Sequence, residues 1–542
     1  MREVNLKHFT FALLVTILVW SSTYQSCNAR RGKHWSHSRT TSDSLYKKKY
    51  KNHGNSYNHH GGGYKSKSPP KPPVKGYTPV VPPPSYDDDN PTISSTTFNV
   101  LQFGAKGDGN TDDTKAFEAA WVAACKVEAS TVLVPPNYVF LVGPISFSGP
   151  CCRQNIVFQL DGTIIAPTSW KAWGSGLFQW ILFSKLNGIS VQGKGIIDGR
   201  GSLWWKESSQ LDESINDESL LVVPITNTTT DKNNSQAVTS SDLFGKMPSI
   251  KPTALRFYGS FNATVTGITI QNSPQCHLKF DNCVGVEVFN MNVTSPGNSL
   301  NTDGIHLQNS KDVVIHSTNL ACGNFNARIA TINFSVHIQH LKNYKKPSSD
   351  DCVSVQTGCS NIYIHNVNCG PGHGISIGGL GKDNTKACVS NITVRDVVMH
   401  NTTNGVRIKT WQGGSGSVQG VLFSNIQVSE VEFPIVIDQY YCDKRICKNQ
   451  TSAVALSGIN YEKIRGTYTI KPVHFACSDS LPCEGVTLTN IKLEPQQERY
   501  RMFNPFCWQT FGELNTPSLP PIDCLQIGKP SSNRIQSDRD SC

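Results

Sequence analysis

Four short segments in the second half of the chain combine carboxyl, imidazole and cationic side chains. They are Asn301-Thr302-Asp303-Gly304-Ile305-His306, Asp350-Asp351-Cys352, Gly372-His373-Gly374-Ile375 and Arg407-Ile408-Lys409. Hydrolysis of a glycosidic bond needs a carboxylic acid that protonates the leaving oxygen and a carboxylate that activates water. Asp303, Asp350 and Asp351 offer three carboxyl groups for these tasks. The sequence therefore holds the groups for acid–base hydrolysis, provided that the fold brings them together.

Arg407 and Lys409 are two positions apart, so on a strand both side chains point to the same face. A guanidinium and an ammonium on one face suit a ligand that carries carboxylates. Each motif alone has a simpler explanation. Asn-Thr-Asp-Gly and Gly-His-Gly are ordinary turns, and Arg-x-Lys is usually a solvated strand face. Their occurrence together, on one predicted repeat, favours the catalytic interpretation.

The elements that must position these groups are short strands with alternating apolar residues, which recur every 20–30 residues from Phe98 onward. Examples begin at Asn262, Val284, Lys311, Asn361, Asn391 and Asn425. Apart from a predicted helix over Thr114–Cys125, no helical period separates them. This pattern predicts an all-β chain folded as a single-stranded, right-handed parallel β-helix. The alternative is a β-sandwich, but its hairpin turns do not recur here. Equivalent positions of adjacent coils would stack about 4.8 Å apart and cluster the carboxyl groups.

With these motifs in this order, residues 96–530 resemble glycoside hydrolase family 28, and specifically plant-type polygalacturonases. The segment Phe98–Gly109 also looks like the start of that family. The resemblance implies that Asp350 is the proton donor, that Asp303 and Asp351 position the attacking water, and that His373 lies beside the acid. It also implies a set of substrate-binding residues: Asn301, Arg407, Lys409 and Tyr441, with the neighbouring Tyr440 as a competitor for the last place.

The implied reaction is inverting hydrolysis of the α-1,4-galacturonosyl bonds of pectin, without a cofactor or metal. Inverting enzymes usually hold their two carboxyl groups about 6.5–9.5 Å apart, a range that side chains of adjacent coils would reach if angled apart. Two other functions stay open: a noncatalytic pectin-binding protein of the cell wall, and a rhamnogalacturonan hydrolase. The paired cations favour homogalacturonan, with its carboxylate on every residue. Resemblance and proximity further imply three disulfides: Cys352–Cys369, Cys442–Cys447 and Cys477–Cys483.

The N-terminal part differs from the body. Residues 1–29 have the basic start, short apolar run and small residues of a signal peptide, and eighteen cysteines also favour secretion. Residues 30–95 are low in complexity and predicted to be disordered. Within them, residues 30–85 hold twelve Lys and Arg against one acid, a balance of +11, whereas residues 86–542 carry −2. This tail is interpreted either as a tether to an acidic wall or as a spacer or propeptide. A secreted monomer in the cell wall is expected, with pectin as its partner and neither nucleic acid nor a membrane span.

Two segments and one residue depart from the expected pattern. Residues 324–349 separate Ala321-Cys322-Gly323 from Asp350-Asp351-Cys352, which are contiguous in the family; thirteen of these residues are Asn, Lys, Ile, Phe or Tyr, which have AT-rich codons. We interpret this insert as unspliced sequence or a gene-model error, or alternatively as a loop beside the acid. Gly379 replaces a serine that the family usually has, and so removes a hydroxyl near the site. Residues 206–246 are predicted to form a polar surface loop, and residues 531–542 a C-terminal tail.

Overall fold

A computed structural model describes residues 30–31, 96–173, 179–205, 250–299, 301–323, 350–443, 447–496, 504–530 and 542. All of them belong to one of the two units into which the chain divides, residues 1–35 together with 96–542. Most of the predicted signal peptide and basic tail, the loop 206–246, the insert 324–349 and the tail 531–541 lie outside the described residues. No helix in the described part of the chain is long and apolar enough to cross a membrane.

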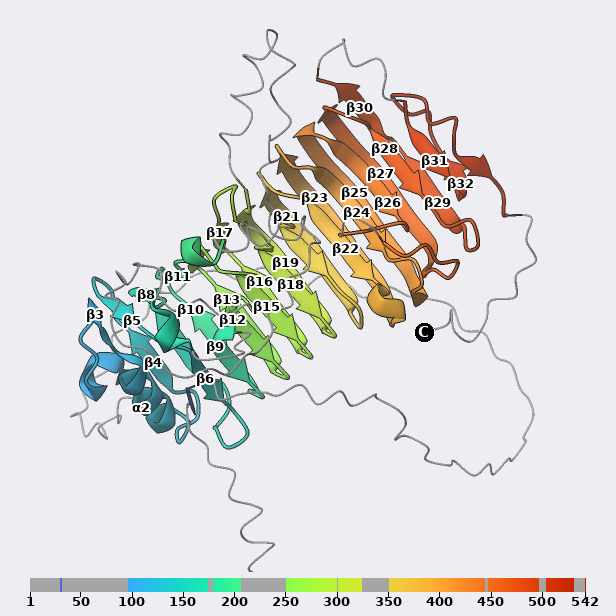
Figure 1. The fold of residues 1–542 in the computed structure, drawn as a ribbon. Coiled ribbons are helices and arrows are strands. Elements are labelled where there is room, and N and C mark those ends of the chain that lie inside the picture. The colour runs from blue at the N-terminus through green and yellow to red at the C-terminus, as the bar shows by residue number, and fades with distance from the viewer. Residues whose placement is uncertain are drawn as a thin grey trace, which may run out of the picture. The chain divides into compact units, whose positions relative to one another are not determined.

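One sheet, sheet A, takes a single short strand from each coil, and its strands follow one another in chain order. All pairings in it are parallel except that of β1 with β6. Its strands are β1 (Arg30–Arg31), β6 (Ile145–Ser148), β9 (Gln179–Ser184), β12 (Thr253–Tyr258), β15 (Leu278–Asp281), β18 (Ile305–Gln308), β20 (Val353–Val355), β22 (Ile375–Leu380), β24 (Asn404–Thr410), β26 (Phe433–Asp438), β28 (Val473–Ala476) and β31 (Phe506–Trp508). Figure 1 shows the coils as successive rungs, with the colour passing from blue beside α2 to red at β30–β32.

The remaining strands form sheet B, which is also parallel. Its first coils contribute two short strands each, and from β19 to β27 one long strand spans both rows, because β19 pairs with both β16 and β17. The strands are β2 (Thr97–Asn99), β3 (Asp108–Asp112), β4 (Thr131–Val134), β5 (Val139–Leu141), β7 (Val157–Leu160), β8 (Thr163–Ile165), β10 (Ser190–Gln192), β11 (Ile196–Asp198), β13 (Phe261–Thr266), β14 (Thr269–Gln271), β16 (Val284–Phe289), β17 (Asn292–Thr294), β19 (Lys311–Ala321), β21 (Ser360–Cys369), β23 (Lys386–His400), β25 (Ser415–Val431), β27 (Ala455–Tyr468), β29 (Cys483–Thr489), β30 (Lys492–Pro495), β32 (Thr510–Leu514) and β33 (Gln526–Ile527).

Two columns of residues with left-handed backbone bend nine successive coils of sheet B, from β10 to β29, at the same places. Asn, Asp and Gly dominate both columns because they adopt positive φ at the lowest cost. The first column comprises Gly188, Asn262, Gly285, Asp312, Asn361, Asn391, Gly420, Gly458 and Gly485. The second follows it five positions later in each coil and comprises Gly193, Gly267, Asn290, Ser317, Asn366, Asp396, Asn425, Lys463 and Asn490.

These columns correct one detail of the predicted repeat. The segments beginning at Asn361 and Asn391 occupy equivalent positions, but Asn425 belongs to the second column and pairs with Asp396. Asn occurs at both bends for the same conformational reason, so the sequence pattern alone does not distinguish them. The side chains of the first column also form ladders, since Asn391 Nδ2 donates to Asn361 Oδ1 at 2.8 Å and Asn361 Nδ2 donates to Asp312 Oδ1 at 2.8 Å.

The core fills the inside of the coils. In sheet A, four phenylalanines of successive coils stack with ring centroids 4.9, 5.3 and 4.9 Å apart, and buried aliphatic residues continue the column from Leu307 onward. The predicted helix is confirmed as α2 (Thr114–Ala124). It buries Phe117 and Trp121, and the Trp121 ring lies 4.9 Å from that of Phe147. The helix therefore covers the N-terminal end of the core. Three short 3-10 helices are described besides it: η1 (Val100–Phe103), η2 (Trp170–Ala172) and η4 (Lys382–Asn384).

Six disulfides lie between described cysteines. The three predicted pairs, Cys352–Cys369, Cys442–Cys447 and Cys477–Cys483, are confirmed. Three more pairs were not predicted: Cys125–Cys152, Cys388–Cys542 and Cys507–Cys524. Cys542 thus attaches the last residue of the chain to β23. Such a set of disulfides fits an oxidising, extracellular environment.

Candidate active site

The predicted catalytic residues meet at the N-terminal ends of the strands of sheet A. Asp303, Asp351 and His373 each precede a strand of sheet A by two residues, and the paired strands β18, β20 and β22 place them in one column. Arg407 and Lys409 lie on β24, the next strand. Stacking of coils about 4.8 Å apart therefore brings together groups that are more than a hundred residues apart in sequence.

Asp351 is fixed by three donors. Ser376 Oγ and Arg407 Nη2 donate to its Oδ1 at 2.8 and 2.9 Å, and Lys409 Nζ donates to its Oδ2 at 2.9 Å. The Asp351 side chain is 1% exposed. Burial raises its pKa, but the neighbouring charges of Lys409 and Arg407 outweigh burial, so the pKa stays below the usual range. Asp351 is thus an ionised carboxylate whose two oxygens are both engaged.

Asp303 and Asp350 share a hydrogen bond, and their pKa values are shifted in opposite directions. Burial and then the charges of Asp350 and Asp351 raise the pKa of Asp303 well above its ordinary value. Burial also raises the pKa of Asp350, but its interactions with His373 and Asp303 lower it overall. His373 Nδ1 lies 3.7 Å from Asp350 Oδ1. These opposite directions favour a single proton shared by the pair and held closer to Asp303.

Three further residues support Asp303 and had no role in the sequence-based prediction. His306 Nδ1 lies 2.8 Å from Asp303 Oδ2, and burial lowers the pKa of His306 to about 3. His277 is fully buried, with Nδ1 3.0 Å from the backbone oxygen of Asp303 and Nε2 2.8 Å from Ser295 Oγ. Burial lowers its pKa to about 4, so a neutral ring holds the backbone of Asp303. Cys276 Sγ lies 3.8 Å from Asp303 Oδ2. His306 stands in a quoted motif, but no sequence signal marks His277.

Tyr441, rather than Tyr440, lies at the cluster. Lys409 Nζ is 5.2 Å from the centre of the Tyr441 ring, whereas Tyr440 Oη donates to Asp479 Oδ2 at 3.0 Å, farther along sheet A. The space beside Gly379 is already occupied, since a Cβ there would approach Trp411 Nε1 to 2.7 Å and the Tyr441 ring to 3.1 Å. Asn301 is exposed, with left-handed backbone, two residues before Asp303. Its role in substrate binding stays a prediction.

The expected wide separation of the carboxyl groups is wrong. One carboxylate oxygen each of Asp350 and Asp351 and one ring nitrogen of His373 all lie within 4.8 Å of one another. Asp303 is in turn hydrogen-bonded to Asp350. The groups are close because two are neighbours in sequence and the third is one coil away. This group, and a second one of Cys276, Asp303 and His306, have side chains of the kinds that bind metals.

The residues that flank the 324–349 segment lie side by side. The backbone N–H of Asp350 donates to the oxygen of Cys322 at 3.0 Å. The flanking strands pair in register, Lys311 with Ser360. The coil is therefore closed by the residues on either side of this segment.

Known proteins resemble this chain in sequence and in fold. A probable polygalacturonase of Arabidopsis thaliana is 37% identical over 436 residues, which are 80% of this chain and 85% of that protein. A polygalacturonase of Cryptomeria japonica is 38% identical over 402 residues, or 73% of this chain and 67% of that protein. The solved polygalacturonase of Erwinia carotovora matches with a TM-score of 0.53 at 22% identity, covering 80% of this chain and 99% of that one. This likeness confirms the predicted right-handed parallel β-helix.

The sequence also matches the family model for glycosyl hydrolases family 28 over residues 125–242, 239–347 and 332–505. Adjacent matches meet at 239–242 and overlap at 332–347, inside the two segments that depart from the expected pattern. The matches cover well over half of the chain and include Asp303, Asp350, Asp351, Arg407 and Lys409. The chain therefore belongs to the glycosyl hydrolases of family 28, as its motifs predict.

Proposed function

We propose that this protein is a pectin-degrading glycoside hydrolase that cleaves the α-1,4-galacturonosyl bonds of homogalacturonan with inversion. The observation that carries the proposal is a group of three neighbouring carboxyls in which the pKa of Asp303 is raised and those of Asp350 and Asp351 are lowered. A hydrolase needs one acid and one base in the same site, and this cluster supplies both.

In the proposed mechanism Asp350 protonates the leaving glycosidic oxygen. It receives the proton from Asp303 along their hydrogen bond. Asp303 is then ionised and accepts a proton from the water that attacks the anomeric carbon, while Asp351 orients this water. One proton goes to the leaving oxygen and hydroxide to the anomeric carbon, so the cluster ends with the single proton it began with. This relay reconciles the donor role of Asp350 with the resting proton on Asp303.

Water is the more suitable nucleophile in spite of the short carboxyl separation, which by itself is typical of retaining enzymes. A retaining enzyme needs a free carboxylate to form a bond with the sugar. Both oxygens of Asp351 accept hydrogen bonds from cations or a hydroxyl, and Asp303 carries the proton. Neither group is a strong nucleophile, so the anomeric carbon is left to water.

Homogalacturonan suits the charges beside the cluster. Arg407 and Lys409 place two cations on β24 beside Tyr441, and a single carboxylate, Asp351, is paired with both of them. A substrate carboxylate would be attracted there. We propose further that Asn301 contacts the substrate, that no metal or cofactor takes part, and that the protein acts as a secreted monomer in the cell wall. The disulfides support the extracellular location.

The test combines product stereochemistry with three variants. NMR of fresh digests of polygalacturonate should show the inverted anomer first, and a retained anomer would refute the role of water. Asp350→Asn and Asp303→Asn should each lower turnover at least about a hundredfold, whereas the exposed Asp523→Asn serves as a matched control and should not change it. A galacturonosyl fluoride, whose leaving group needs no proton, should restore turnover to Asp350→Asn but not to Asp303→Asn. Restoration in Asp303→Asn alone would exchange the two roles.

A further inference from the structure

The outer face of sheet A continues beyond the catalytic cluster toward the C-terminal coils. In register, the column of Arg407 passes through Val436 and His474 to Phe506. The column of Lys409 passes through Asp438 and Ala476 to Trp508. Three coil steps separate β24 from β31, or about 14 Å at about 4.8 Å per step. A polymer lying across the strands at the cluster would reach Phe506 and Trp508 on the same face.

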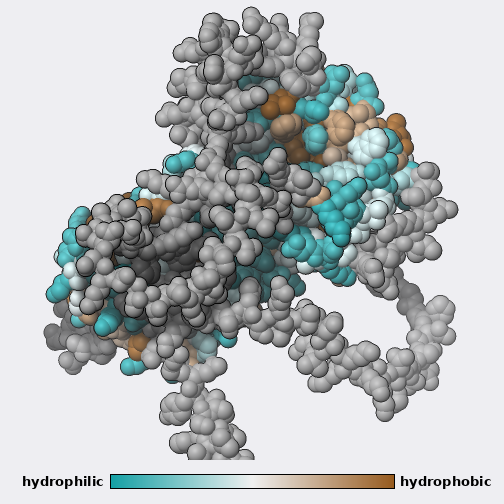
Figure 2. All heavy atoms as spheres, viewed as in Figure 1, coloured by the Kyte–Doolittle hydropathy of each residue, from teal (hydrophilic) through white to brown (hydrophobic). Residues whose placement is uncertain are grey.

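These aromatic side chains are unusually exposed. Phe506 is 37% and Trp508 48% exposed, although most large aromatic residues in the described coils are buried. In Figure 2, apolar tan and brown side chains appear on the visible surface toward the C-terminal coils, and teal hydrophilic side chains lie nearer the middle of the molecule. Exposed aromatic groups in a row with a binding site commonly mark an interaction surface.

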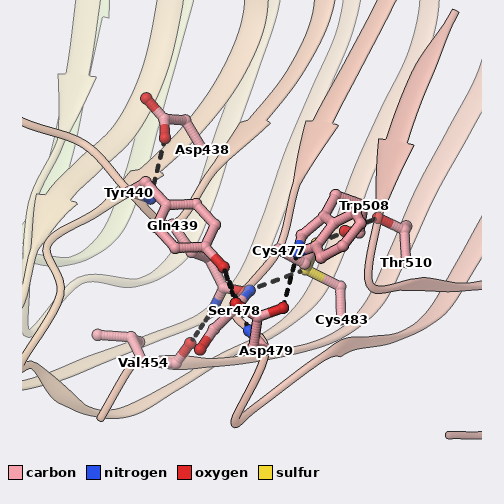
Figure 3. Close-up of a disulfide and its surroundings, with 10 residues drawn as sticks. All are labelled: Asp438, Gln439, Tyr440, Val454, Cys477, Ser478, Asp479, Cys483, Trp508 and Thr510. Atoms are coloured by element: carbon pink, nitrogen blue, oxygen red, sulfur yellow. Dashed lines mark hydrogen bonds between the residues drawn. A yellow bond between two sulfur atoms is a disulfide. The ribbon is translucent and has the colours of Figure 1, made fainter. Parts of the chain in front are cut away.

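Hydrogen bonds hold two of the rings in place. Tyr440 Oη donates to Asp479 Oδ2 at 3.0 Å, and Trp508 Nε1 donates to Asp479 Oδ1 at 2.8 Å. Figure 3 shows Asp479 between the two rings, next to the Cys477–Cys483 disulfide. Phe506 stacks on His474 with ring centroids 5.0 Å apart. We call Tyr440, Phe506 and Trp508 the aromatic platform. It is ordered before any ligand arrives, which lowers the entropy cost of binding.

The charges around the platform differ from those at the other end of the same face. Arg256 and Lys279 precede the cluster in the column of Arg407. The platform instead holds the exposed carboxylate of Asp479, with Asp438 in the neighbouring column and Lys471 as the cation near Phe506, 5.0 Å from its ring centre. A free galacturonate carboxylate at Asp479 would meet a like charge.

We propose that the aromatic platform is a distal subsite for pectin residues whose carboxyl group is methyl-esterified. The rings stack on the apolar face of the sugar, and the ester removes the charge that Asp479 would repel. The subsite rests on the proposed function because it places the same polymer on the same face of sheet A. A chain would thus carry its free carboxylate at Arg407 and Lys409 and tolerate esters beyond them.

The test is calorimetric titration in an Asp350→Asn background, so that the ligand is not consumed. The ligands are trigalacturonate, hexagalacturonate and an esterified hexamer, in which the three residues at one end keep free carboxylates and the other three are methyl-esterified. Trp508→Ala should weaken binding of the esterified hexamer about tenfold, the ratio for loss of one stacking contact, and leave the trimer unchanged. Phe506→Ala should act in the same direction. Asp479→Asn should make the affinities of the free and the esterified hexamer more alike. Phe261→Ala removes an aromatic residue, 54% exposed, from sheet B and is the matched control.

Equal binding of the esterified hexamer by the parent and by both platform variants overturns the subsite, as does no binding of this ligand by the parent. Stronger parent binding of the free hexamer than of its ester overturns the preference for esters. Turnover of polygalacturonate by the unmodified protein is measured separately. A protein that turns over the polymer while its platform variants bind like the parent refutes the subsite alone. A protein without turnover whose binding of the ester depends on Trp508 refutes the hydrolase and retains the subsite.

Discussion

Deletion of residues 324–349 is predicted to preserve the fold and to raise both stability and activity. Asp350 N already donates to the oxygen of Cys322 at 3.0 Å, so only Gly323 has to bridge the closed coil. Lys311 pairs with Ser360, which is 49 positions later, and removing 26 residues leaves 23. This is close to the 27 positions that separate Val284 from its partner Lys311. The shortened coil therefore has an ordinary length.

The magnitude follows from loop closure. Each doubling of a loop costs about 0.6 kcal/mol, and going from a direct joint to a loop of this length is about four doublings, so deletion should stabilise the fold by about 2 kcal/mol. Turnover should rise as well, because the segment joins the chain immediately before Asp350, the proposed proton donor. We further expect that protein from the native source lacks the segment.

Denaturant unfolding of both forms, turnover of polygalacturonate and peptide mapping of native protein check these expectations. A lower free energy of unfolding in the deleted form would show that the segment is part of the folded structure. A native tryptic peptide spanning Ile329–Lys342 would disprove its removal. If the full chain binds pectin but only the deleted form hydrolyses it, the full chain is the noncatalytic binding protein considered as the alternative function.

Four more predictions concern the charged groups of the site, metal binding and the basic tail. Asp303→Asn should raise the unfolding temperature at pH 8 but not at pH 3. The pKa of Asp303 is higher in the folded protein than in the unfolded chain, where it is about 3.9. The protonated carboxyl therefore contributes its full stability below the unfolded pKa, and this stability is lost as pH rises through the folded pKa. Lys409→Met should destabilise the fold by about 3 kcal/mol because it removes a buried partner of Asp351, whereas Lys382→Met, in an exposed pair, should cost about 1 kcal/mol or less in the same unfolding assay. Dialysis against EDTA should leave turnover intact, and a loss restored by a divalent cation would contradict the metal-free mechanism. Deletion of residues 30–85 should lower the salt needed to elute the protein from demethylated pectin without changing turnover of a trimer, because exposed charges are screened over about 8 Å; unchanged elution would make this segment a spacer.

The sequence allowed prediction of the coil architecture, the helix and the members of the catalytic cluster, because periodicity and motif order are local properties. It did not allow prediction of where the proton lies, since the pKa of Asp303 depends on burial and on carboxylates from another coil. The carboxyl separation failed for a similar reason, because side-chain directions at the edge of sheet A are tertiary properties. Cys388–Cys542 joins residues 154 positions apart and has no spacing signal. His277 is a single buried residue that resembles any core histidine.

The constant five-residue spacing of the two left-handed columns has a consequence for how such a protein can diverge. Sheet B admits no change of length without loss of register. The longer segments outside the described residues, 174–178, 206–249, 324–349 and 497–503, each precede a strand of sheet A. Insertions and deletions are thus admitted at the edge where Asp303, Asp350 and His373 stand. A lineage could lengthen or shorten the surroundings of its active site, and so alter which polymers it admits, while the five-residue step between the two left-handed columns stays constant.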